Sequence, residues 1–341
     1  MAFKQATVNA SKVAATLTNY PAYVDLSRVG ITTLAEAQSV RVYTDSAKTV
    51  EIAREIVSAT EMHCKIPSLT TTTTIYIDYD GVRADYAVTD TYGRNAVWAD
   101  YDVVYHFDAI VSGVWVNSTG GTNGSASTLT DVGASIPTET TGAINGGGNF
   151  GTVSNKRGID TTIAAQLTTA LANDSRWTQQ FWFRVNGNPS TAMIWTEGAS
   201  SSGFYNYAGM NTNGTVLTKL RGGTTQITAS SFANNTWHML HWVKNGNTSS
   251  DRYINAGGKQ TATGSGTQTT DENVVIGGID RSTFQNAVKD LIDEFRLRKS
   301  DISENWITTE YNNQSDEATF WGTWTDVNSE APTPSGMMMW W

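Results

Sequence analysis

The sequence has little cysteine, little proline and little charge. Its 341 residues include one cysteine and six prolines, and 16% are charged, where an ordinary soluble domain has roughly 25%. A single cysteine, Cys64, excludes a disulfide framework and a cysteine metal cage. No apolar run approaches the ~18 residues that a membrane-spanning helix needs, so we expect no membrane span.

Basic residues are also few, and the N-terminal sequence contains no apolar run of the kind found in a signal peptide. The net charge of −9 argues against nucleic acid as the main partner, because neutralising phosphates requires a basic face. No apolar run precedes Pro21, so no signal peptide is readable and we expect synthesis in a cytoplasm. Hydrophobic residues make up 39% of the chain, which is enough to build a core and excludes wholesale disorder.

The pattern that is present is one of strands and turns. Asn-Gly pairs are strong hairpin signals because both residues tolerate positive φ. They recur at Asn123-Gly124, Asn145-Gly146, Asn186-Gly187, Asn213-Gly214 and Asn245-Gly246. Between such turns, alternating apolar residues predict a half-buried strand around Phe181–Val185, and a run that is apolar on both faces predicts a central strand at Trp237–Val243. The pattern predicts an all-β fold of the sandwich or jelly-roll type.

Helix is expected in one place. Ser303 can cap a helix whose first turn holds Glu304, and Trp306, Ile307 and Tyr311 follow at helical spacing. A domain boundary is predicted near residues 107–113, before a stretch rich in Gly, Ser, Thr and Asn. From about Asp326 the chain reads as an extended, proline-containing linker with an apolar tip.

Several segments of the N-terminal part of the chain resemble a known module. It is the domain of unknown function 2341, a bacterial and phage β-sandwich module, and the similar segments are Leu17–Leu26, Val40–Asp45, Ile66–Leu69 with Thr73–Tyr79, and Val97–Phe107. One departure from its pattern is Tyr79-Asp80-Gly81, where the family usually has a Tyr-Gly-Asn turn. The resemblance implies a small N-terminal β-sandwich over residues 1–108.

The rest of the chain resembles a laminin-G-like domain of the concanavalin A-like lectin/glucanase fold. The similar segments are Asn234–Leu240, Val275–Gly278, Leu291–Leu297 and Ile302–Gln314. The resemblance implies a larger jelly-roll sandwich over residues 109–325. The linker composition and the apolar tip of residues 326–341 predict a C-terminal docking arm. It also allows a calcium ion at the sandwich rim, but no calcium-loop signature names its ligands.

A sugar-binding surface is the first candidate site. Sugars stack on exposed aromatic rings, and neighbouring amides bind their hydroxyls. Trp195, Tyr205, Asn206 and Tyr207 lie in a loop-rich stretch and are the candidates for binding a glycan. The alternative is that a large sandwich simply buries these aromatics in its core.

Catalytic and metal signatures are weak. Glucanases of this fold use two carboxylates on one strand face, and the nearest candidates are Asp290, Asp293 and Glu294. Strand alternation places Asp293 and Glu294 on opposite faces, so we expect no catalytic residues. The four histidines are spread across both predicted domains and have no metal-binding spacing, which gives no case for a metal. They are His63, His106, His238 and His241. His238 and His241 lie on opposite faces of one predicted strand and are expected to be partnered groups of the core.

The C-terminal tip is the second candidate site. An exposed apolar tip is a liability in a soluble monomer, so the tip is predicted to make an assembly contact. Its residues are Met337, Met338, Met339, Trp340 and Trp341.

Both resemblances imply modules of recognition and assembly. Laminin-G-like modules usually act outside cells, and a virion protein reconciles that role with the missing signal peptide. The leading hypothesis is a non-enzymatic phage virion structural protein, a head decoration, fibre or tail component. Its expected partners are other virion proteins, further copies of itself and a host-surface glycan. The alternatives are a glucanase-type glycan depolymerase and a bacterial surface adhesin.

Overall fold

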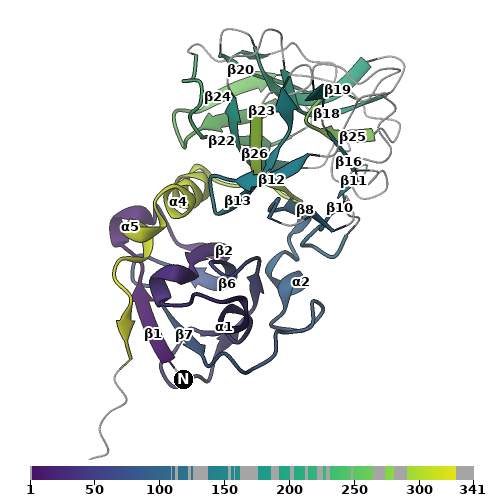
Figure 1. Ribbon diagram of the computed structural model, residues 1–341. Helices are drawn as coiled ribbons and strands as arrows, with labels where there is room; N and C mark the ends of the chain where they lie inside the picture. Colours follow the sequence, from purple (N-terminus) through teal and green to yellow (C-terminus); the bar gives the residue numbers. More distant parts are fainter. Residues whose placement is uncertain are drawn as a thin grey trace, which may run out of the picture.

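The fold is all-β and is organised as two bodies joined end to end (Figure 1). A computed structural model describes residues 2–108, 110–111, 114–121, 124–125, 137–152, 155–156, 158–161, 176–185, 192–199, 203–211, 214–220, 226–227, 231–246, 249–263, 273–279 and 290–327. In that part of the chain, no helix is long and apolar enough to cross a membrane.

The first body is a small sandwich of two antiparallel sheets. One has the strand order β27-β1-β7-β3-β4 and the other β2-β6-β5. Their strands are β1 (Ala2–Thr7), β2 (Leu17–Asp25), β3 (Arg41–Tyr43), β4 (Glu51–Ile52), β5 (Arg54–Ile56), β6 (Glu61–Leu69), β7 (Thr74–Tyr79) and β27 (Thr325–Asp326). Short helices connect them: η1 (Ala10–Lys12), η2 (Leu26–Val29), α1 (Leu34–Gln38) and α2 (Arg94–Val97). Between the sheets lies a core of buried aliphatic residues such as Val24, Val42 and Ile77.

The second body is a larger antiparallel sandwich. One sheet has the order β12-β13-β26-β17-β22-β23-β24 with β8 also on β26, and the other β21-β20-β19-β18-β25-β16-β11-β10-β9. The first sheet contains β8 (Tyr101–Tyr105), β12 (Thr138–Thr141), β13 (Gly146–Asn149), β17 (Trp177–Val185), β22 (His238–Lys244), β23 (Ser249–Ile254), β24 (Gln260–Thr263) and β26 (Asp290–Arg298). The other contains β9 (Ile110–Val111), β10 (Val114–Trp115), β11 (Gly124–Ser125), β16 (Ile159–Thr161), β18 (Ala192–Ala199), β19 (Gly203–Met210), β20 (Val216–Lys219), β21 (Gln226–Ile227) and β25 (Asn273–Ile276). A separate hairpin pairs β14 (Gly151–Thr152) with β15 (Asn155–Lys156).

Tryptophan rings from both sheets fill the core of this sandwich. Trp242 makes edge contacts with Trp177 and Trp195, with ring centroids 4.9 and 5.9 Å apart. Edge-to-face packing of this kind is favourable beyond the area that it buries. The predicted strands around Phe181 and Leu240 are therefore confirmed as β17 and β22, which pair with each other.

The predicted helix is confirmed as α4 (Glu304–Ser315). Its cap is Ser303, whose hydroxyl accepts the backbone N–H of Trp306 at 3.2 Å. The helix lies on the outer face of β17, where the Trp182 indole N–H donates to Gln314 at 2.7 Å. For this reason β17 is buried on both faces, and not on one face as its alternating pattern predicts.

After α4 the chain returns to the first body. Helix α5 (Glu317–Trp321) places Trp321 in the core of the first sandwich, and β27 pairs with β1 through Asp326 and Lys4. The predicted bounds of the domains and of the docking arm stay predictions, but the contacts of residues 303–326 join both bodies. Most of the predicted arm, residues 328–341, lies outside the described residues.

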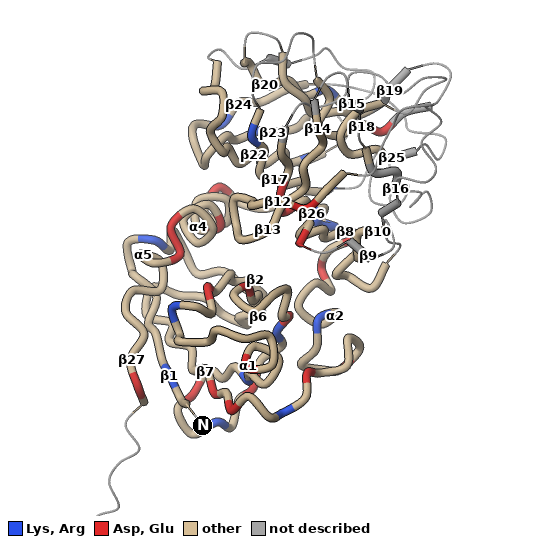
Figure 2. The backbone as a smooth tube through the Cα atoms, viewed as in Figure 1, with Lys and Arg blue, Asp and Glu red and all other residues tan. Residues whose placement is uncertain are grey.

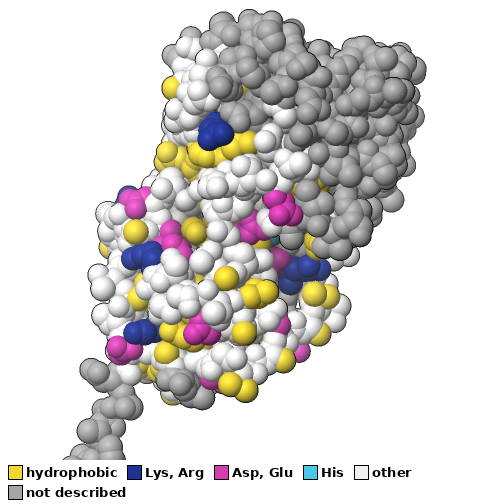
Figure 3. Space-filling model, viewed as in Figure 1, with side chains coloured by type: hydrophobic (Ala, Val, Ile, Leu, Met, Phe, Trp, Pro, Cys, Tyr) yellow, Lys and Arg dark blue, Asp and Glu magenta, His cyan; other side chains and the backbone are white. Residues whose placement is uncertain are grey.

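Charged positions gather where the two bodies meet. Figure 2 shows acidic and basic positions close together on β26, where Glu294 and Arg296 are buried. On the face of the first body shown in Figure 3, acidic and basic side chains are interspersed among polar and hydrophobic ones. The concentrated charge in the described part of the chain is thus internal, at the junction of the two bodies.

Candidate functional site

A β-bulge in β26 creates the first element of the site. On one edge of β26, β13 pairs with Leu291 and Ile292, and β8 then takes over from Phe295 onward. On the other edge, the register with β17 shifts between Gln180 and Trp182. Glu294 lies in this irregularity with a φ of 51°, in the left-handed region that a glutamate rarely adopts. The bulge turns its carboxylate toward the first body.

Strand β6 supplies the second element. Glu61 and His63 are two residues apart, so strand alternation places them on the same face. Both are fully buried, and His63 Nε2 lies 3.1 Å from Glu61 Oε1. The first body therefore presents a carboxylate and an imidazole toward the bulge of the second.

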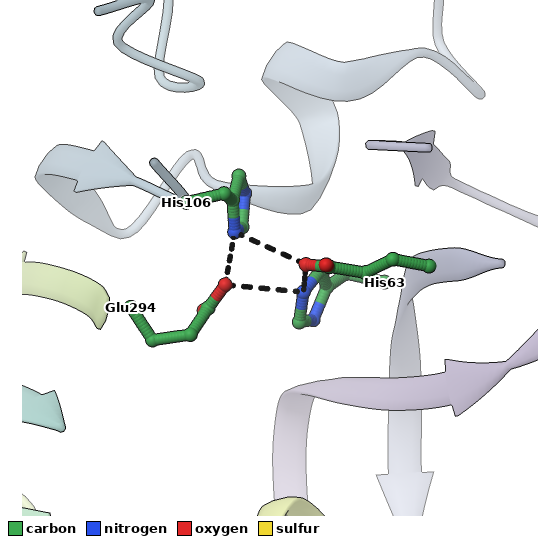
Figure 4. Close-up of side chains that lie close together, drawn as sticks. His63, His106 and Glu294 are labelled. Carbon is green, nitrogen blue, oxygen red and sulfur yellow. Dashed lines mark hydrogen bonds and ion pairs between the residues drawn. The ribbon is translucent and has the colours of Figure 1, made fainter. Parts of the chain in front are cut away.

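His106, just after β8, lies between these two groups. Its Nδ1 is 2.5 Å from Glu294 Oε1 and 3.6 Å from Glu61 Oε1. Its ring stacks on that of His63 with centroids 4.9 Å apart. Figure 4 shows His63, His106 and Glu294 converging on one point from three different segments.

Glu55 on β5 holds the other side of the His106 ring. His106 Nε2 lies 3.0 Å from Glu55 Oε2, which also accepts the indole N–H of Trp98. The Ser118 hydroxyl donates to Glu55 Oε1 at 2.6 Å. A carboxylate with three partners orients the ring and fixes which nitrogen faces the cluster.

Burial and the neighbouring charges shift the pKa values of the cluster in opposite directions. Burial alone would lower the pKa of His106, but the carboxylates of Glu294 and Glu55 raise it to about 10. Burial lowers the pKa of His63, and burial with nearby acidic groups raises that of Glu61. Burial would also raise the pKa of Glu294, but Arg296 and His106 hold it well below its ordinary value. One charged histidine therefore sits among several carboxyl groups.

Two further acids border the cluster. Asp293 is fully buried, and its Oδ2 accepts the backbone N–H groups of Ala143 and Ile144, each at 2.9 Å. Burial raises the pKa of Asp108 to about 6. The site is thus richer in acids than in the cations that could neutralise them.

A cavity of about 160 Å³ lies beside this cluster. His106, Glu55 and Asp108 line it together with Arg94 and Ser118. The cavity lies on the His106 side of the cluster.

The structure does not place the predicted sugar-binding residues at the surface. Trp195 on β18 is 0% exposed and packs in the core, and Tyr207 on β19 is 5% exposed. Asn206 is also buried, and its amide donates to Glu197 at 2.5 Å. The predicted exposed platform is therefore wrong for these three: Trp195 packs in the core between the sheets, and Tyr207 packs in a separate buried cluster with Met193, Leu217 and Ile279. The side chain of Tyr205 lies outside the described part of the chain.

The other predicted site also lies outside the described residues. It comprises Met337, Met338, Met339, Trp340 and Trp341. The side chain of Asp290 falls outside them as well, and Asp293 and Glu294 are buried.

Sequence reasoning missed the cluster of His63, His106 and Glu294. Its members come from distant segments, with 188 residues between His106 and Glu294 alone, so no spacing motif could connect them. The spacing of the histidines gave no case for a metal, but the fold brings His63 and His106 together, and their rings stack. The local sequence carried one sign of the cluster: Glu61 and His63 are two residues apart on a strand and therefore lie on the same face.

Comparisons with known proteins bear on the second body. Residues 157–308 match the family model of the concanavalin A-like lectin/glucanases superfamily. No curated protein matches the chain.

Several solved structures are similar to parts of the chain. A Trypanosoma rangeli sialidase in complex with sialic acid has 11% identity and a TM-score of 0.44, covering 74% of this chain and 42% of that one. Domain 4 of AbnA, an extracellular arabinanase from Geobacillus stearothermophilus, in complex with arabinotriose, has 14% identity and a TM-score of 0.45, covering 61% of this chain and 97% of that one. The binding domain of botulinum neurotoxin serotype G has 13% identity and a TM-score of 0.47, covering 65% and 54%.

The match spans about a third of the length of another sialidase structure from Trypanosoma rangeli. The assignment of residues 157–308 does not depend on these distant likenesses, because it follows from the family model. Residues 157–308 therefore form a concanavalin A-like lectin/glucanase domain.

Proposed function

We propose that the chain is a non-enzymatic structural protein of a bacteriophage virion, and that its concanavalin A-like domain presents a surface to host glycans. The observation that carries the proposal is the match of residues 157–308 to lectins and glucanases. Because fold alone does not fix function, the choice between binding and hydrolysis depends on the acidic residues of the domain.

The contacts of these acids support binding. A retaining glucanase needs two carboxyl groups about 5–5.5 Å apart that both reach the scissile bond. Asp293 and Glu294 are each 0% exposed. Asp293 is occupied by backbone N–H groups, and Glu294 by Arg296 and His106. Neither carboxylate can reach a polysaccharide in this arrangement.

The junction of the two bodies supports a role in display. Consecutive residues of α4 contact different bodies: the Asn313 amide pairs with the backbone of Tyr23, and the Gln314 side chain accepts from Trp182. Because α4 contacts both bodies, the lectin-like domain is fixed on the first sandwich. A protein of a particle surface needs such an arrangement to hold the glycan-binding face in one orientation. Other virion proteins and further copies of the chain would contact the first body or the 326–341 arm.

The test combines particle composition with ligand binding. Mass spectrometry of purified virions should detect the polypeptide, and a glycan array probed with the full chain should give binding without release of reducing sugar. The proposal fails if virions lack the polypeptide. Sugar release that is lost in Glu55→Gln or Asp108→Asn, the acids of the cavity, would instead establish a depolymerase.

A further inference from the structure

We propose that Glu61, His63, His106 and Glu294 bind a divalent transition-metal ion, with zinc the best fit, and that this ion joins the two bodies. Each residue offers one ligand atom, and the four atoms all lie within 4.8 Å of one another. The inference is independent of the proposed virion role, because it depends only on the geometry of this junction.

The spacing of the ligand atoms fits a tetrahedral site. With zinc bonds of about 2.1 Å, the edges of the tetrahedron are about 3.4 Å. His63 Nε2 lies 3.1 Å from Glu61 Oε1 and 3.9 Å from Glu294 Oε1, and His106 Nδ1 lies 3.6 Å from Glu61 Oε1. The contact of His106 Nδ1 with Glu294 Oε1, at 2.5 Å, must open by about 1 Å when the ion binds.

The contact between two carboxyl groups is a second observation. The fully buried carboxyl group of Glu61 hydrogen-bonds to that of Asp108, on the cavity side, and Glu294 lies close to both. Carboxylates held this close repel one another unless a proton or a cation lies among them. A cation at the centre of the four ligand atoms would compensate these acids.

The surroundings of the ligands resemble those of established metal sites. A metal-binding histidine usually donates its other ring N–H to a carboxylate, and His106 meets Glu55 in this way at 3.0 Å. The far oxygen of Glu294 is held by the Arg296 guanidinium. Glu55 is in turn fixed by Trp98 and Ser118.

The ligand set also indicates which ion is bound and what it does. Imidazole and carboxylate together suit zinc and its neighbours, whereas calcium takes 6–8 oxygen ligands. Four protein ligands close the coordination sphere, which is typical of a structural site and not of a catalytic one. Because β6 lies in the first body and β26 in the second, the ion would act as a cross-link between them.

The first measurement is metal content and metal-dependent stability of the full chain. Metal analysis by mass spectrometry should find about one equivalent of zinc per chain after purification without chelators. Removing the metal with a chelator should lower the melting temperature, and zinc, but not calcium, should restore it. Cobalt substitution should give the visible absorption of a tetrahedral site.

Variants separate metal binding from simple loss of stability. His63→Gln and the more conservative Glu61→Gln should abolish the zinc-dependent rise in melting temperature. Glu55→Gln should weaken zinc binding about 10–100-fold, as expected for a carboxylate that supports a ligand. His241→Gln is the matched control, because His241 is also a fully buried strand histidine paired with a glutamate, Glu310 at 3.1 Å. It should keep one zinc per chain.

Three results would overturn the proposal. One is a wild-type chain that carries no metal and shows no zinc-dependent stabilisation. Another is an equal response to calcium and zinc. The third is zinc uptake that survives in a folded Glu61→Gln variant, since the ion would then lie elsewhere.

Discussion

At the scale of single residues, His238 shows how fixed partners restrict protonation. Its Nε2 donates to the Ala233 carbonyl at 3.1 Å, and its Nδ1 accepts from the Asn255 amide at 3.0 Å. Asn255 cannot turn its oxygen toward the ring, because that oxygen already accepts the Met239 N–H at 2.9 Å. A proton on Nδ1 would therefore face the amide N–H donor of Asn255. Burial also lowers the pKa of His238.

This arrangement predicts a pH-dependent contribution to stability. Because the folded-state pKa of His238 lies below its unfolded value of about 6.5, the contribution is present above that pH and is lost as the pH falls through the folded-state pKa. The slope for one proton is at most about 1.4 kcal/mol per pH unit. Urea unfolding between pH 5 and 8 should show a weaker pH dependence for His238→Gln than for wild type. Equal slopes would contradict the prediction.

Glu294 marks the limit of what single residues reveal in the sequence. Strand alternation predicts Leu291, Phe295 and Leu297 on one face, but the structure places Ile292 in the core with Phe295 and Leu297. The bulge at Glu294 shifts the pattern by one residue. It arises where β26 changes its pairing partner, and the position of a partner strand is not encoded in the local pattern.

At the scale of elements, a side chain of α4 forms hydrogen bonds with backbone groups at the edge of β2. Strand β2 lies at the edge of its sheet, where unpaired backbone groups invite association with other chains. The Asn313 amide accepts the Tyr23 N–H at 2.7 Å and donates to the Tyr23 carbonyl at 3.0 Å. The Trp321 indole N–H donates to the same carbonyl at 2.9 Å. Two side chains thus replace part of a neighbouring strand.

Removing the Asn313 amide should therefore cost stability. Asn313→Ala leaves the buried N–H of Tyr23 without a partner, and such a group costs about 1–3 kcal/mol. The Tyr23 carbonyl keeps the Trp321 indole. Chemical denaturation should show this loss, while Asn305→Ala, at an exposed position of the same helix, should change stability by less than about 0.5 kcal/mol. An equal effect of both variants would show that the Asn313 contact contributes nothing.

Elements with a strong local pattern were predictable from the sequence, and their surroundings were not. The cap at Ser303 and the spacing of Trp306 and Ile307 predict α4 correctly, because capping and helical periodicity are local. The burial of the outer face of β17 could not be predicted, since α4 covers it from far along the chain, with 132 residues between Trp182 and Gln314. Separation in sequence also hid the cluster around His106, whose members the fold alone brings together.

At the scale of the whole molecule, a buried polar network links the two bodies. It runs from Glu55 through His106 and Glu294 to Arg296, and from there to Glu310 on α4. Breaking a buried ion pair by removing one partner is strongly destabilising, because the remaining charge is uncompensated. Such a network also resists sliding, since each group is satisfied only in one arrangement. The two bodies should therefore keep a fixed relative orientation.

The C-terminal elements make the first body dependent on the end of the chain. Trp306, Phe320 and Trp321 belong to its core, and β27 pairs with β1. Burying each large side chain contributes about 1.5–3 kcal/mol, or roughly 5–9 kcal/mol for the three. A domain has a net stability of about 5–15 kcal/mol. The first body should therefore not stay folded without them.

Two truncated chains test this dependence. A chain ended after Val327 keeps every contact described above and should melt as the full chain does. A chain ended after Ile302 loses the three aromatic residues and β27, so hydrogen exchange should become fast in β1 and β2, the strands that these elements contact. Protection that persists in β1 and β2 of the shorter chain would show that the first body folds alone. Normal folding of the longer chain would leave residues 328–341 free for an assembly contact, because the fold would not require them.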